Sequence, residues 1–149
     1  MKVVATLCIT VAALIALPAI SQPTQFAKPE DAIKYRKSTL KEMQQNFKRV
    51  ADMASGKASF DATVAQESAQ RAADLIKLPW AGFGPGTEGG KAKPDIWKEQ
   101  AKFKDLAGKS EEQVAKLAAA AKTGSLDDIK AAVGAAGASC KACHDAFKE

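Results

Sequence analysis

Residues 125–147 have the sequence SLDDIKAAVGAAGASCKACHDAF. Their apolar positions recur in alternating steps of three and four, at Leu126, Ile129, Val133, Ala136, Cys140, Cys143 and Phe147. Such steps place side chains along one face of an α-helix. Ser125 and the acids that follow it are typical of a helix start. The stretch therefore predicts a helix that buries one face, with both cysteines on that face.

The end of this stretch, Cys140-Lys-Ala-Cys-His144, has the spacing of a c-type haem attachment site. Two thiols can add to the two vinyl groups of one porphyrin, and the histidine that follows can ligate the iron. In a helix all three side chains lie on one face. The motif predicts one covalent haem c per chain, bound through Cys140 and Cys143, with His144 as axial ligand.

Three other uses of the motif can be weighed. A zinc site needs four protein ligands, or three and a water, and His144 is the only histidine of the chain. A thioredoxin-like pair follows a strand of a βαβ unit, and no segment has a strand pattern. A disulfide between Cys140 and Cys143 leaves His144 without a role. Haem is favoured, and a redox dithiol stays the alternative.

The N-terminus has the pattern of a secretory signal peptide. Lys2 precedes an uncharged apolar run over residues 3–17, and small residues follow. Ala19-Ile-Ser21 predicts cleavage before Gln22; cleavage after Thr24 and an uncleaved anchor are the alternatives. Export agrees with the motif, because bacteria attach c-type haem outside the cytoplasm. The sequence thus predicts a periplasmic protein with no membrane span once the signal is removed.

The composition of the 149 residues favours one all-α domain. Hydrophobic residues make up 46% and aromatic residues 6%, and β-branched runs are absent beyond the first twenty residues. The formal net charge is +5, but the charges are interspersed and basic aromatic clusters are missing. These features argue against a nucleic acid partner. The mild positive charge suits acidic redox partners or membrane surfaces, and a solvated lysine-rich surface is the alternative.

Apolar periodicity predicts three further helices. The first begins at Pro29 and ends before Gly56, with Arg36 at the edge of its apolar face. The second begins near Ser59 or Asp61 and ends at Pro79, with its buried face supplied by Phe60, Val64, Ala72, Leu75 and Ile76.

Residues 78–93, rich in glycine and proline, predict a long functional loop whose Trp80 and Phe83 cover something apolar. The third helix begins at Pro94 and runs about 26 residues to a cap at Lys122 and Gly124. A break near Gly108 is the alternative. Four helices with one core predict an antiparallel four-helix bundle, with the haem between its helices.

The sequence resembles the cytochrome c′ family, the class II c-type cytochromes. The resemblance covers the mature chain and is carried by residues 25–36 (QFAKPEDAIKYR), 78–90 (LPWAGFGPGTEGG) and 137–147 (GASCKACHDAF). It implies a signal peptide over residues 1–24, a bundle domain over 25–149, and a homodimer formed through the first two helices. Many members carry arginine four residues after the histidine, where this chain has Lys148.

The resemblance also implies the haem surroundings. The iron is five-coordinate and high-spin, with His144 on one side and Leu40 covering the other. Arg36 contacts a haem propionate, and Trp80 and Phe83 line the pocket.

An open sixth position predicts binding of a small diatomic gas, nitric oxide above all, and single-electron transfer is the second hypothesis. A six-coordinate electron-transfer cytochrome with Met43 or Met53 as sixth ligand is the alternative. Enzyme activity is not expected, because no acid–base residue accompanies Leu40.

Overall fold

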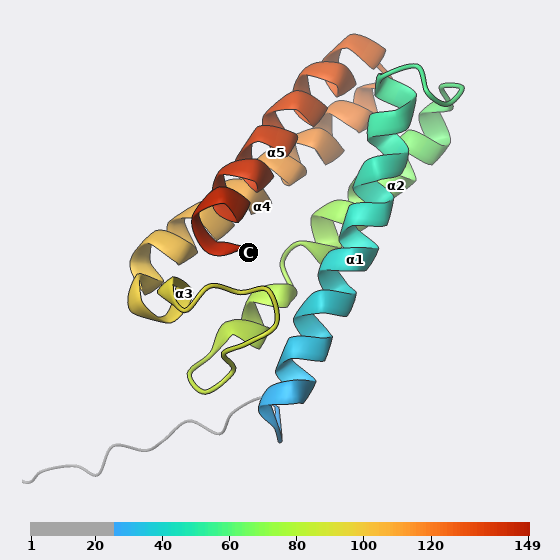
Figure 1. Ribbon diagram of the computed structural model, residues 1–149. Coiled ribbons are helices and arrows are strands. Elements are labelled where there is room, and N and C mark those ends of the chain that lie inside the picture. The colour runs from blue at the N-terminus through green and yellow to red at the C-terminus, as the bar shows by residue number, and fades with distance from the viewer. Residues whose placement is uncertain (1–25) are drawn as a thin grey trace, which may run out of the picture.

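The computed structural model describes residues 26–149, which form an antiparallel bundle of four long helices (Figure 1). These are α1 (Pro29–Ala54), α2 (Ala62–Leu75), α4 (Gln100–Thr123) and α5 (Leu126–Phe147). A 3₁₀ turn, η1 (Pro79–Phe83), and a short helix, α3 (Asp95–Lys98), lie in the connection between α2 and α4. Within the described residues the only β pairing is an isolated bridge between Ala92 and Lys148. The predicted all-α bundle is confirmed.

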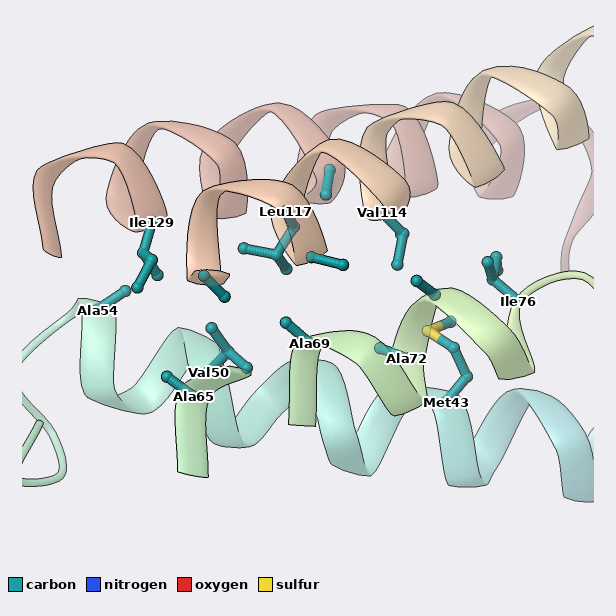
Figure 2. Packing of buried hydrophobic residues seen from close by; sticks show 14 of the residues in the cluster. Met43, Val50, Ala54, Ala65, Ala69, Ala72, Ile76, Val114, Leu117 and Ile129 are labelled. Atoms are coloured by element: carbon teal, nitrogen blue, oxygen red, sulfur yellow. The ribbon is translucent and has the colours of Figure 1, made fainter. Parts of the chain in front are cut away.

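Each long helix packs against two neighbours, so the four close into a ring. The packed pairs are α1 with α2, α2 with α4, α4 with α5, and α5 with α1. The enclosed core is apolar and rich in alanine, which lets the helices approach closely. Figure 2 shows Val114, Leu117 and Ile129 pointing from α4 and α5 toward Val50 and Ala69 of α1 and α2.

The predicted helix ends are confirmed where a specific cap supports them. Asp61 Oδ1 accepts a hydrogen bond from the Val64 amide at 2.9 Å, and Ser125 Oγ accepts one from the Asp128 amide at 3.3 Å. Gly124, at φ +71°, takes the left-handed conformation that ends α4.

The third predicted helix is wrong in one respect. It breaks at Glu99 (φ −109°, ψ 47°), which separates α3 from α4, and it continues unbroken through Gly108. Inside α4 the Ser110 hydroxyl donates to the Leu106 carbonyl at 3.0 Å instead of capping a new helix. Ile96 and Phe103, on either side of the break, pack in the same apolar cluster.

The second predicted helix is also corrected. It ends at Leu75 rather than at Pro79, and Pro79 instead begins η1. Phe60 and Val64 were expected in its buried face, but each is 38% exposed; Ala65, Ser68, Ala69 and Ala72 take that face. Small residues there let α2 lie close to α1 and α4.

The predicted signal peptide lies outside the described residues. Within residues 26–149, no helix combines the length and the apolar character needed to cross a membrane.

Candidate functional site

The motif residues occupy the last full turns of α5, where the predicted helix is confirmed. Cys143 is buried, Cys140 is half-buried and His144 is exposed. Both cysteines are free thiols. The helical spacing of three and four residues places the three side chains on neighbouring positions of one face.

Burial sets the protonation of these groups. It raises the pKa of Cys140 and that of Cys143, so both sulfurs stay protonated thiols at neutral pH. Partial burial and the positive charge of Lys148 lower the pKa of His144, against an opposing effect of Asp145. His144 is therefore a neutral imidazole at pH 7, the form that ligates a metal.

An aromatic cluster surrounds Cys143 at this end of the bundle. Its centre is Phe103 of α4, whose ring centroid lies 5.0 Å from that of Phe83, 5.9 Å from Trp80 and 5.5 Å from Phe147. Trp80 also packs against the main core, so it lies where the two clusters meet. The loop aromatics thus cover an apolar surface that includes Cys143, as the sequence predicted.

Arg36 is buried, although it is a charged residue at the edge of the apolar face of α1. Its Nη1 donates to the carbonyls of Gly82 (2.6 Å) and Thr87 (2.7 Å), and its Nη2 donates to the carbonyl of Gly89 (2.7 Å). The guanidinium carbon lies 4.4 Å from the centroid of Phe83. One side chain of α1 therefore holds the loop over residues 82–89 against the bundle.

The guanidinium has capacity left for another acceptor. It carries five N–H donors, and the three short bonds to carbonyls use three of them. The Nε–H and one Nη2–H have no acceptor among the described residues. Arg36 thus holds the loop and has two N–H donors left for a carboxylate acceptor.

Leu40 lies one turn after Arg36, half-buried, and packs against the main core. The two methionines weighed as iron ligands are buried in that same core. In Figure 2 the Met43 sulfur lies among the side chains around Ala72 and Ile76. Neither methionine belongs to the cluster that contains Cys143.

Comparison with known proteins decides the family. The family model described as Cytochrome C' matches residues 31–148. The chain belongs to the cytochrome c′ family.

Two members of the cytochrome c′ family match over nearly their full length. The cytochrome c′ of Alcaligenes xylosoxydans xylosoxydans is 49% identical over 84% of this chain and 98% of its own length. The cytochrome c′ of Rubrivivax gelatinosus is 52% identical over 84% of this chain and 99% of its own length. Its crystal structure superposes with a TM-score of 0.81, covering 84% of this chain and all of the other.

Ligand complexes are known for one relative. A nitric oxide complex of a leucine-to-alanine variant of the Alcaligenes xylosoxidans cytochrome c′ has a TM-score of 0.81 and 47% identity. It covers 84% of this chain and 98% of the other.

Members of the cytochrome c′ family carry covalent haem c and are gas-binding or electron-carrying proteins rather than enzymes; the chain is thus a haem c protein. Its residues fit that group. The buried Trp80 Nε1 has no hydrogen-bond partner among the described residues, an orphaned donor that a ligand oxygen would satisfy. The same residues contain no cluster of three or more His, Cys, Asp or Glu side chains suited to a bare metal ion.

Three contributors to the site were not predicted. Trp97 Nε1 donates to the Gly84 carbonyl at 2.8 Å, and the buried Thr87 hydroxyl donates to the same carbonyl at 2.7 Å. Lys93 contacts the end of α5. Thr87 is the only threonine in the glycine-rich loop over residues 78–93, so the sequence could have indicated that its hydroxyl has a structural role. Lys93, in contrast, looks like any other surface lysine in the sequence.

Proposed function

We propose that this protein binds nitric oxide at a five-coordinate haem c, attached through Cys140 and Cys143 and ligated by His144. The observation that carries the proposal is that one relative of the same fold, the Alcaligenes xylosoxidans cytochrome c′, forms nitric oxide complexes in variants that are 47% identical to this chain. The neutral imidazole and the apolar surroundings of Cys143 support the same assignment. Haem supplies the iron chemistry; the protein holds and shields it.

The open face of the iron would be covered by Leu40. An aliphatic side chain gives no hydrogen bond and no ligand, so it admits a small diatomic molecule and resists larger ones. Met43 and Met53 are both buried in the main core, where a methionine usually fills apolar space, and this supports five-coordination over a methionine-ligated iron. Arg36 would bind a haem propionate with its remaining donors, while Trp80 and Phe83 line the pocket.

The decisive test combines coordination state with gas binding. The ferrous and ferric protein should have high-spin optical spectra, and stopped-flow mixing of the ferrous protein with nitric oxide should produce a nitrosyl spectrum. Leu40→Ala should bind nitric oxide faster, whereas Lys41→Ala, on the exposed side of α1, should not. A six-coordinate, low-spin spectrum that becomes high-spin in Met43→Leu or Met53→Leu would establish the electron-transfer alternative instead.

Single-electron transfer is a second candidate because of the charge beside the motif. The bridge between Ala92 and Lys148 brings Lys91 and Lys93 to the end of α5. Together with Lys148 they outnumber the acids Asp145 and Glu149 at that end, and the small excess of positive charge suits an acidic redox partner. Reduction by an anionic reagent should then be faster than by a matched cationic one, and the difference should shrink with added salt.

The cellular context completes the proposal. Residues 1–24 would be a cleaved signal and residues 25–149 the mature periplasmic domain, which N-terminal sequencing of the purified protein tests. The exposed Phe60 and Val64 at the start of α2 support a homodimer through α1 and α2. Sedimentation equilibrium should give twice the monomer mass.

A further inference from the structure

The last turn of α5 contains the proposed iron ligand and ends in backbone carbonyls that the helix cannot pair by itself. The last four carbonyls of any α-helix lack an intrahelical donor. Here those belong to residues 144–147, the turn that begins at His144. The His144 carbonyl accepts from the Lys148 amide at 2.9 Å, within the chain's own end. The other carbonyls depend on donors from elsewhere.

Lys93 supplies two of those donors from a distant part of the sequence. Its backbone amide donates to the Phe147 carbonyl at 3.0 Å, and its Nζ donates to the Asp145 carbonyl at 3.1 Å. A lysine that bonds the final carbonyls also meets the negative end of the helix dipole. One residue therefore caps the helix that bears the haem motif, across a separation of 52 residues.

The neighbours of Lys93 extend the contact into a short antiparallel pairing. Ala92 forms the bridge with Lys148, and the Glu149 amide donates to the Lys91 carbonyl at 3.0 Å. We call residues 91–93 with residues 147–149 the clasp. The clasp ties the end of the long connection to the end of α5, while buried Phe147 anchors the same turn in the aromatic cluster.

We propose that Lys93 is a positioning residue for the axial histidine. Its ammonium fixes the carbonyl of Asp145, next to His144, and its amide fixes the end of the turn, so the imidazole keeps one orientation. Without the ammonium the turn can fray, and the imidazole can tilt from the iron. The inference rests on the proposed function only for the ligation of iron by His144, not for gas binding.

The experiment measures the iron–histidine bond directly in the ferrous holoprotein without added gas. Resonance Raman spectroscopy of the wild type should show an iron–histidine stretching band. Lys93→Met keeps the apolar stem and the backbone amide but loses the ammonium, so the band should move to lower frequency and broaden. Lys93→Arg keeps a charged donor and should restore the wild-type band.

A matched control removes a lysine far from the clasp. Lys57 is exposed in the connection between α1 and α2, away from the C-terminal end of α5 (Figure 1). Lys57→Met should leave the band unchanged. Amide exchange at Lys148 should be roughly tenfold faster in Lys93→Met than in Lys57→Met, because the turn opens more often.

Two results would overturn the inference, and they are distinguishable. If Lys93→Met shows the wild-type iron–histidine band, Lys93 does not position the ligand, and the proposed function is untouched. If the wild type itself lacks the band, His144 is not the iron ligand, and the site assignment fails together with the inference.

Discussion

Replacing Arg36 by methionine should destabilise the protein by about 3–5 kcal/mol. The guanidinium makes three bonds of 2.6–2.7 Å to the carbonyls of Gly82, Thr87 and Gly89. A hydrogen bond to a charged group contributes about 1.5–3 kcal/mol net. The sum is reduced because burial of the guanidinium has a cost, visible in the lowered pKa of Arg36. Methionine fills the apolar space but leaves these carbonyls without a charged donor.

Urea denaturation of the ferric holoprotein, followed by helical circular dichroism, measures the change. Limited proteolysis shows in parallel whether the loop over residues 84–90 opens before the bundle unfolds. Arg36→Lys should recover only part of the loss, because one ammonium cannot reach three carbonyls in the geometry of the planar fork.

Arg49→Met is the matched control, since it makes the same change in the same helix. Arg49 has a single bond of 3.3 Å, from Nη1 to the Ser68 hydroxyl, so the cost should stay within about 1 kcal/mol. An Arg36→Met protein within 1 kcal/mol of wild type, with a loop no more sensitive to protease, would refute the reasoning that Arg36 holds the loop.

The remaining predictions concern the packing of the loop and the outer surface. Gly82→Ala should cost about 1–3 kcal/mol, because its Cβ would meet the Ala32 carbonyl oxygen at 2.8 Å. Gly84→Ala, whose Cβ meets nothing within 4 Å, should stay near wild type in the same urea titration. Trp97→Phe keeps an aromatic ring but loses the indole N–H that bonds the Gly84 carbonyl, which should lower stability by about 1 kcal/mol in thermal denaturation. Phe60→Lys should convert the proposed dimer to monomers in sedimentation equilibrium with unchanged helical content; a dimer that persists would place the interface elsewhere.

Local patterns predicted what depends on local chemistry. Steps of three and four gave the helix that carries Cys140 and Cys143, and Asp61 and Ser125 marked helix starts through caps that act within four residues. The prediction that Phe60 is buried was wrong because burial there depends on tertiary packing, namely on which side of α2 meets α1 and α4. Alanines take that side because helix proximity there favours small residues over large ones.

The role of Arg36 shows why the site was harder to predict than the fold. In the sequence it is a charge at the edge of an apolar stripe, a position equally suited to a surface residue. Its burial depends on carbonyls more than forty residues away, brought near by the chain path through η1. No sequence pattern within α1 indicates that those carbonyls lie next to Arg36.

The connection between α2 and α4 is held at two places, and this arrangement constrains what it can do. Arg36 of α1 fixes residues 82–89, and the clasp fixes residues 91–93 to the end of α5. Phe83, Trp97 and Phe103 pack between these attachments, around the buried Cys143. Because both attachments would have to break for the connection to swing away, we expect it to act as a fixed wall of the haem pocket rather than as a lid. The double variant of Arg36 and Lys93 should consequently be more sensitive to protease than the sum of the two single variants, and simple additivity would contradict the idea of a wall held at two places.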